Sequence, residues 1–232
     1  MSILTSPLAV FDLETTGVNV ERDRVVTAHV GHLSPTGEIS LRTDWLVNPG
    51  IEIPAGASAV HGISTDSAVA EGVEAAVGVA QIIEALNHAQ DQGFPIVAYN
   101  AAYDLTLLDR EARRYGLAPF EPRLVLDPLI IDKAVDRYRK GKRTLIAACE
   151  TYGVALDAAH EASADAIAAG LVAQAILRAY PELDELSLDE LHGRQQLWQR
   201  EQAESFADWK RRNGEPSFVP EIGWPLRALS LS

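Results

Sequence analysis

The sequence contains little cysteine and no long hydrophobic segment. Its 232 residues include one cysteine, Cys149, so no disulfide can form within the chain, which fits a reducing compartment. Residues 1–7 lack a basic segment followed by an apolar core, so no signal peptide is predicted. No apolar run approaches the length of about 18 residues that a membrane span needs. These absences favour a cytoplasmic protein without a membrane partner.

Positive charge is also scarce. The chain has 20 Lys and Arg against 33 Asp and Glu, for a net charge of −13. Proteins that coat nucleic acid usually carry a basic face, so this balance argues against that class. The exception is the segment 137–143, in which Arg137, Arg139, Lys140, Lys142 and Arg143 are basic. A solvated loop is the simpler interpretation of this segment, and contacts to phosphate are the alternative.

The order of apolar runs and turn residues predicts a mixed α/β fold. Hydrophobic content of 47% and charged content of 23% are typical of a globular domain. Strands are expected at 8–12, 25–33 and 38–47, as an antiparallel meander. Shorter strands at 96–99 and 124–126 then alternate with helices, which predicts a mixed sheet with helices on its faces. Residues 51–60 contain Pro54 and Gly56 and are expected to form a loop.

The C-terminal part has a different composition. Residues 182–214 carry mixed charges and few apolar residues, and we expect helices there that pack on the domain or on a partner. Prolines make the last 17 residues an extended tail, in which Trp224 is a candidate anchor. We therefore divide the chain into a domain at 1–181 and an extension at 182–232. Binding to a polymerase, self-association and simple packing are three open roles for this extension.

Two carboxylates lie at the end of the first predicted strand. Asp12 and Glu14 are two residues apart, so on a strand both side chains point to one face. On a buried strand they repel each other and lose hydration, which is costly unless a cation or a shared proton compensates. A solvated strand end is the simple alternative. However, Thr15, Thr16 and Gly17 add hydroxyls and a flexible backbone at the strand end, which favours half of a divalent metal site.

Two further acids lie near predicted helix starts. Asp104 follows Asn100 where a short strand gives way to a helix, and Asp165 follows His160 by five residues. An acid in the first turn of a helix complements the helix dipole, so each acid alone is a weak signal. Together with Asp12 and Glu14 they form a pattern in fixed order along the chain.

This pattern resembles the DEDDh 3′–5′ exonucleases, the DnaQ-like group that includes the proofreading (epsilon) subunit of bacterial replicative polymerases. Phe-Asp-Leu-Glu-Thr-Thr-Gly at 11–17 matches the first motif of that group letter for letter. Asn-x-x-x-Asp at 100–104 and His-x-x-x-x-Asp at 160–165 follow in the same order. The resemblance covers about residues 7–178 and implies a ribonuclease-H-like fold, in agreement with the predicted strand order, so the domain at 1–181 would be the exonuclease.

The resemblance also implies roles for individual residues. It assigns metal binding to four acids: Asp12, Glu14, Asp104 and Asp165. It assigns the role of general base to His160, and its spacing to Asp165 is that of the histidine-type branch. The residues expected at the substrate are Thr15, Thr16, His61 and Asn100. Tyr103 departs from the commoner phenylalanine but keeps the aromatic ring.

The residue types suit phosphodiester hydrolysis. Two Mg²⁺ or Mn²⁺ ions can together activate water and stabilise the leaving 3′-oxygen, and such hard ions prefer carboxylate oxygens. An imidazole with a pKa of about 6.5 can take the proton of the water. The leading hypothesis is a 3′–5′ exonuclease acting on the 3′ end of single-stranded DNA, in proofreading or repair. Removal of RNA 3′ ends and a non-catalytic module that binds a polymerase or nucleic acid are the alternatives.

Overall fold

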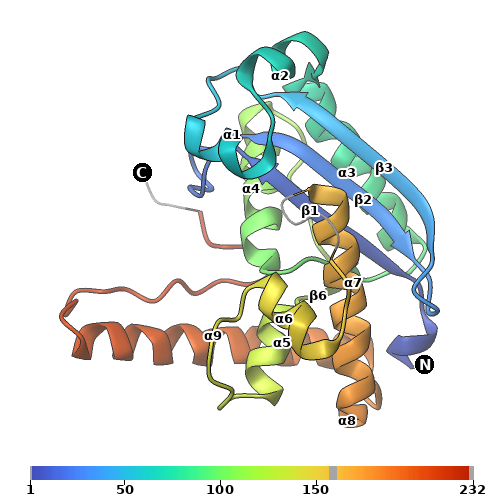
Figure 1. Ribbon diagram of the computed structural model, residues 1–232, viewed down its shortest axis with the longest axis vertical. Helices are drawn as coiled ribbons and strands as arrows, with labels where there is room; N and C mark the ends of the chain where they lie inside the picture. Colours follow the sequence, from blue (N-terminus) through green and yellow to red (C-terminus); the bar gives the residue numbers. More distant parts are fainter. Residues whose placement is uncertain (1, 157–160, 230–232) are drawn as a thin grey trace.

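The computed structural model describes residues 2–156 and 161–229, and its centre is a six-stranded sheet (Figure 1). The strand order is β4-β3-β2-β1-β5-β6. Neighbouring pairs among β1, β2 and β3 are antiparallel, and the other pairs are parallel. The strands are β1 (Leu8–Thr15), β2 (Val25–Leu33), β3 (Ile39–Asn48), β4 (Val73–Glu74), β5 (Ile96–Val97) and β6 (Val125–Leu126). The predicted meander followed by parallel strands is therefore confirmed.

Helices lie on both faces of this sheet, as the sequence predicted. They are α1 (Ala55–His61), α2 (Thr65–Glu71), α3 (Ala75–Asp91), α4 (Ala101–Arg114), α5 (Pro128–Val135), α6 (Leu145–Tyr152), α7 (Ala162–Ala179), α8 (Pro181–Asp184) and α9 (Leu188–Arg212), and a 3₁₀ turn spans Ile3–Thr5. Helix α7 packs on β1 and β2, whereas α3 and α4 pack together on the opposite face (Figure 1).

The alternation of side chains along β1 decides which face carries the acids. Phe11 and Leu13 are buried in the core on the α3–α4 side, and Leu8 and Val10 are buried in the core on the α7 side. Because side chains in a strand alternate with period two, Asp12 follows Val10 onto the α7 face, and Glu14 follows Asp12. The strand therefore presents both acids to the helix that carries Asp165.

Helix α7 packs closely on β1 at Gly170. A Cβ atom placed on Gly170 would lie 2.4 Å from Cγ1 of Val10, so no larger residue fits without moving the helix. Helix α7 is also the one described helix that could cross a membrane by length and composition, with a mean hydropathy of 1.2. Of that helix, 56% is buried inside the protein. Its apolar composition is thus accounted for by its place in the core.

The segment 51–60 differs from the expectation of a loop. Pro54 begins a helical turn, and α1 runs from Ala55 to His61, where Gly62 ends it with φ of 78°. None of its residues is fully buried, so the segment lacks the apolar periodicity that identifies a helix in a sequence. Proline at the start of a helix and glycine after its end are the local signals that the prediction passed over.

The C-terminal residues pack against the rest of the chain. Helix α9 lies across the lower part of the molecule, and the tail then returns toward α4 (Figure 1). Leu183 and Leu191 are buried in the core beside α7, and Trp224 is buried in the core beside α4. The predicted helical extension is present, and Trp224 is an anchor as expected. The boundary between a domain at 1–181 and an extension at 182–232 stays a prediction.

Candidate active site

Three of the predicted acids meet at the end of β1. Asp12 and Glu14 come from this strand, and Asp165 comes from the first turn of α7. One carboxylate oxygen from each residue lies within 4.8 Å of the others. All three side chains are partly buried. Residues 153 positions apart in the sequence are therefore brought to one point by the packing of α7 on β1.

The fourth acid lies beside this group. Asp104 is in the first turn of α4, its side chain is only 4% exposed, and its Oδ1 accepts a hydrogen bond of 3.3 Å from the backbone N–H of Leu13. Leu13 separates Asp12 from Glu14 on β1, so this bond fixes α4 against the strand between the two acids. The Asp104 carboxylate is close enough to Asp12 to raise its pKa.

The acids hold an excess of negative charge. Burial raises the pKa of Asp12 well above its usual range, and the charges of Asp104, Glu14 and Asp165 raise it further. Burial raises the pKa of Asp104 in the same way, although the Leu13 hydrogen bond opposes the shift. Burial and the neighbouring Asp165 raise the pKa of Glu14 to about 7. The cluster is thus stable only with bound protons or with a cation among the carboxylates.

This donor set fits hard divalent ions. Its four side chains offer only carboxylate oxygens, which are the ligands that Mg²⁺ and Mn²⁺ prefer, and among the residues that the structure describes no thiolate or imidazole nitrogen belongs to the group of three acids. The raised pKa values are the expected result of bringing such ligands together without their cation. The cluster therefore has the composition of a divalent metal site.

We expect divalent metal to raise the melting temperature of the protein, and by more at pH 8 than at pH 5. Because the pKa of Glu14 rises in the folded protein from about 4.5 to about 7, the metal-free fold loses stability as pH rises through this interval. Metal at about 100 times its Kd would add about 2.7 kcal/mol, or about 5–10 °C for a chain of this size. Thermal unfolding in EDTA, MgCl₂ or MnCl₂ at both pH values measures this, and an equal melting temperature in all three would contradict it.

The residues after Glu14 form a turn held by side-chain hydrogen bonds. The Thr15 hydroxyl lies 2.7 Å from the carbonyl oxygen of Gly17 and 2.6 Å from the Tyr103 hydroxyl, which donates to the same carbonyl at 2.5 Å. Thr16 is 2% exposed, and its hydroxyl donates to Asp23 and accepts from the N–H of Arg24. The Thr16 side chain therefore stabilises the turn. Substrate contact by Thr15 and Thr16 stays a prediction.

The other predicted substrate residues come from two different elements. His61 ends α1 and lines a cavity of about 290 Å³ together with Glu14, and burial lowers the pKa of its imidazole. Asn100 is exposed and precedes α4 with φ of 66°, in the left-handed region. His160 lies outside the described residues, and its role as general base stays a prediction. Helix α7 begins two residues after it.

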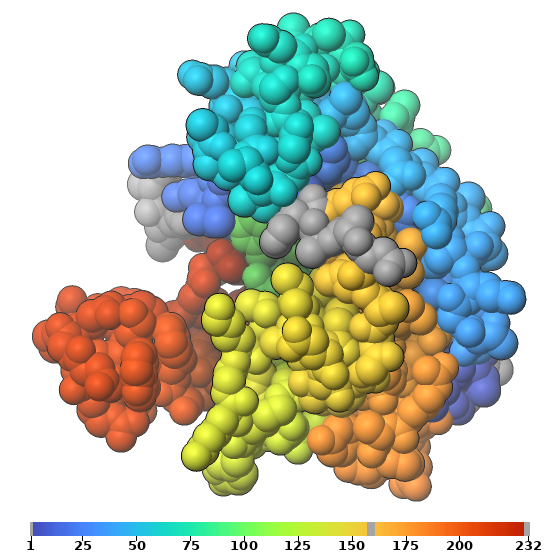
Figure 2. Space-filling model, viewed as in Figure 1, coloured from blue at the N-terminus to red at the C-terminus, as the bar shows by residue number. Residues whose placement is uncertain are grey.

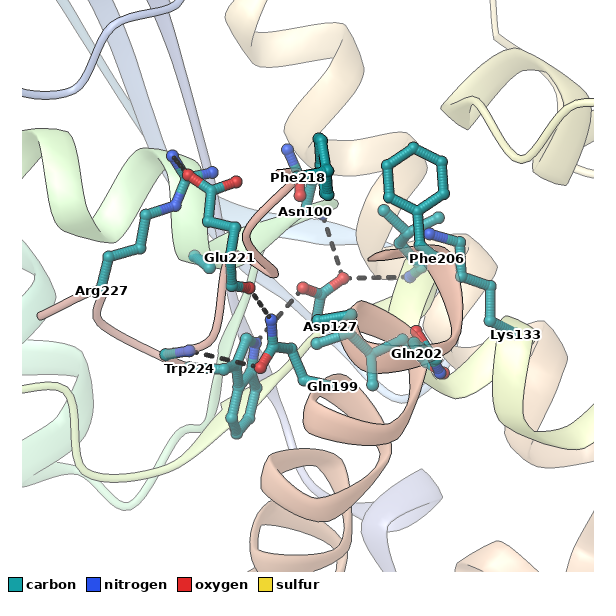
Figure 3. A pocket seen from close by; sticks show the side chains of 15 residues that line it. Asn100, Asp127, Lys133, Gln199, Gln202, Phe206, Phe218, Glu221, Trp224 and Arg227 are labelled. Atoms are coloured by element: carbon teal, nitrogen blue, oxygen red, sulfur yellow. Dashed lines mark hydrogen bonds and ion pairs between the residues drawn. The ribbon is translucent and has the colours of Figure 1, made fainter. Parts of the chain in front are cut away.

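Asp127 is a buried acid of the site region that the sequence interpretation left without a role. It follows β6, and its carboxylate accepts hydrogen bonds of 2.9–3.0 Å from the backbone N–H groups of Asn100, Ala101 and Leu129. The indole of Trp224 donates to it as well, at 3.3 Å (Figure 3). Burial raises its pKa to about 6, and these hydrogen bonds oppose the shift. Asp127 therefore joins the start of α4, which carries Asp104, to α5 and to the tail.

The signal for Asp127 was local. Aspartate at the end of a strand and directly before a proline is a typical helix N-cap, with the proline at the first helical position. Asp127-Pro128 has this form and caps α5. The same carboxylate also binds the start of α4, because β5 and β6 pair in parallel. A sequence pattern does not reveal this pairing.

The fold and the acid cluster together define a nuclease of the ribonuclease-H-like class. The exonuclease family model RNase_T matches residues 9–172, so it spans the meander, α4 and all four acids. The chain belongs to this exonuclease family, and within it to the DEDDh, DnaQ-like group that the motifs indicated.

Relatives agree with this assignment. A DNA polymerase III subunit epsilon-like protein of Rhodobacter capsulatus is 34% identical over 188 residues, which cover 75% of this chain and 24% of that protein. A PolC-type DNA polymerase III of Lacticaseibacillus paracasei is 25% identical over 174 residues, which cover 75% of this chain and 11% of that protein. The chain thus spans about a quarter of the first relative and about a tenth of the second.

Solved structures share the fold. The E. coli exonuclease I complex with a dT13 oligonucleotide superposes with a TM-score of 0.67 at 20% identity, over 78% of this chain and 43% of that one. An exonuclease I of Methylocaldum szegediense gives a TM-score of 0.62 at 21% identity, over 77% of this chain and 42% of that one. At this identity the likeness establishes the architecture, and it confirms the ribonuclease-H-like fold.

Proposed function

We propose that the protein is a divalent-metal-dependent exonuclease that removes nucleotides from the 3′ end of single-stranded DNA. The observation that carries this proposal is the meeting of Asp12, Glu14 and Asp165 within 4.8 Å, with Asp104 beside them, on an exonuclease fold. The relation to an epsilon-like protein of a DNA polymerase and to exonuclease I bound to a dT13 oligonucleotide supports the choice of DNA. The 3′–5′ polarity follows the DEDDh group that the motifs indicate.

Each residue has a separate task in this proposal. Asp12, Glu14, Asp104 and Asp165 hold two Mg²⁺ or Mn²⁺ ions, which when bound polarise the phosphate and make a water molecule more acidic. His160 accepts the proton of that water, because an imidazole of ordinary pKa, about 6.5, is a suitable base at neutral pH. Asp165 follows it by five positions.

Other groups orient the substrate. The turn at Thr15 and Thr16, the exposed Asn100, and His61, whose imidazole lies beside the Thr15 backbone, contact the terminal nucleotide. Tyr103 fixes the turn through its hydrogen bonds to Thr15 and Gly17. Asp127 holds the first turn of α4 so that Asp104 stays opposite β1.

A gel assay tests polarity, metal dependence and substrate together. We expect a 5′-labelled single strand of DNA to shorten in one-nucleotide steps with MgCl₂ or MnCl₂ and to stay intact in EDTA. His160→Ala should slow the shortening by about 10²-fold or more while keeping the metal-induced rise in melting temperature. Labelled mononucleotide as the first product would show the opposite polarity, and an intact strand under all metal conditions would contradict the proposal.

The same assay separates the alternative substrates. An RNA strand of the same sequence, shortened faster than DNA, would make RNA 3′ ends the substrate. Proofreading beside a polymerase is a more specific form of the proposal, and it predicts faster removal of a mismatched than of a matched 3′ end.

A further inference from the structure

A groove between α5 and α9 lies outside the acid cluster. It has a volume of about 680 Å³. One wall is α5 and the basic segment after it, and the other wall is the second half of α9. Figure 2 shows these walls as the yellow-green surface and the red helix beside it. Helix α9 lies beyond residues 9–172, so the family match gives this wall no role.

The groove is basic in an acidic protein. Four cations line it, namely Lys133, Arg137, Arg139 and Arg143, and Glu201 is the acid among the lining residues. The whole chain, by contrast, has a net charge of −13. Such a local reversal of sign attracts an anionic ligand.

Two of these cations have a structural task. Arg139 and Arg143 donate to Oδ2 of the fully buried Asp132 at 2.6 and 2.8 Å, which ties the basic segment to α5. Arg137 is exposed, and in the described part of the chain neither it nor Lys133 forms an ion pair within 4.0 Å. Arg137 and Lys133 are therefore the cations with charge to offer to a ligand.

The opposite wall presents aromatic rings to solvent. Phe206 and Trp209 are 50% and 51% exposed, and their rings stack at 6.0 Å with an interplanar angle of 18°. Trp198 also lines the groove and is partly buried against both main core clusters. Exposed aromatic faces opposite cations are the combination that binds single-stranded nucleic acid, because bases stack on the rings while phosphates meet the charges.

The groove continues toward the acid cluster. Lys133, Gln202 and Phe206 also line a second cavity, of about 220 Å³, which reaches Asn100 and Ala102. In Figure 3, Lys133 and Phe206 lie together on one side of this cavity, and Asn100 lies near its upper end. Since Asn100 precedes the helix that carries Asp104, the two cavities form a path from the basic groove to the start of α4.

We infer that the α5–α9 groove binds the part of a single-stranded nucleic acid that lies on the 5′ side of the nucleotide to be removed. This inference rests on the proposed exonuclease function, because it assigns the rest of the same strand. Bases stack on Trp209 and Phe206, and phosphates contact Arg137 and Lys133. The groove then increases the affinity for long strands. It adds no affinity for strands too short to extend from the acid cluster into the groove.

Two substitutions at exposed positions test this without disturbing the core. Trp209→Ala should weaken binding of a 12-nucleotide dT strand in EDTA by at least about fivefold, the loss expected for one stacked base. Arg137→Gln should lower the slope of log K against log salt by about 0.7, the value for one phosphate contact in a single strand. Lys142→Gln is the matched control, because Lys142 is exposed in the same basic segment but does not line the groove. Fluorescence anisotropy measures all four proteins.

Hydrolysis of short strands separates this inference from the proposed function. Both groove variants should cleave a labelled trinucleotide at the wild-type rate and a 12-nucleotide strand more slowly at low concentration. If both variants keep the wild-type affinity, salt slope and cleavage, the inference about the groove is wrong and the proposed exonuclease function is unaffected. A wild-type dimer in solution that Trp209→Ala converts to monomer, with unchanged strand affinity, would also overturn it and assign this face to self-association. No cleavage of any strand by the wild type would instead contradict the proposed function.

Discussion

Asp12→Asn is expected to reduce turnover by at least about 10³-fold and, in EDTA at pH 8, to raise the melting temperature. The loss of activity follows from the loss of one metal ligand, since bound metal supplies several kcal/mol of transition-state stabilisation. The gain in stability follows from removal of a buried charge that Asp104, Glu14 and Asp165 repel. Measurement of kcat and of thermal unfolding on the same preparation checks both.

Asp109→Asn is the matched control for this experiment. Asp109 lies on α4 like Asp104, is 1% exposed, and accepts hydrogen bonds from Arg110 at 2.7 Å and Arg113 at 2.8 Å. Its loss leaves two cations without their buried partner, so the melting temperature should fall while turnover stays near the wild-type value. Stability and activity should therefore change in opposite directions in the two variants. Equal activity in Asp12→Asn and wild type would remove Asp12 from the metal site.

The opposite responses reflect two uses of buried acids in one fold. Asp109 and Asp132 are buried with arginines and stabilise the folded chain. Asp104 is buried and Asp12 is partly buried among other acids, and their raised pKa values are the destabilisation expected of a metal site without its cation. An acid cluster of this kind persists because the packing of α4 and α7 on β1 holds it together.

The sequence predicted the parts of the site that depend on local spacing. The alternation along β1 was sufficient to place Asp12 and Glu14 on one face, because period two is a property of any strand. The strand–helix junction before Asp104 and the helix start near Asp165 were also visible in the chain. That these three segments meet came from the family resemblance, since no periodicity shows that α7 packs on β1.

The features that the sequence did not predict depend on long-range contacts. The sequence placed Asp127 at the end of a strand. In the structure its carboxylate also binds the start of α4 and the indole of Trp224, 97 residues later in the chain. The sequence showed segment 137–143 as one uniform basic cluster. In the structure Asp132 forms ion pairs with Arg139 and Arg143, whereas Arg137 is exposed. Composition records which charges are present, and only the fold decides which of them are already paired.

The contacts of α9 lead to the second large expected effect. β6 is the edge strand of the sheet, and α9 covers its edge with side chains. Gln195 is fully buried, accepts from the N–H of Asp127 at 2.7 Å and donates to the carbonyl of Val125 at 2.9 Å. His192 accepts from the N–H of Val125 at 3.1 Å. These groups take the place of a further strand, and without them the edge would hold unpaired backbone groups.

Gln195→Leu should therefore lower the melting temperature by about 4–24 °C, because two buried backbone groups lose their partners at about 1–3 kcal/mol each. Gln196→Leu, the same change at the exposed neighbouring position, should have little effect.

Removal of residues 182–232 takes away this edge cover together with the buried Leu191 and Trp224, so the fragment 1–181 should show no cooperative thermal transition. A fragment that unfolds cooperatively at the wild-type temperature would instead establish 1–181 as an independent domain, and α9 would then be an appendage that the nuclease fold does not need.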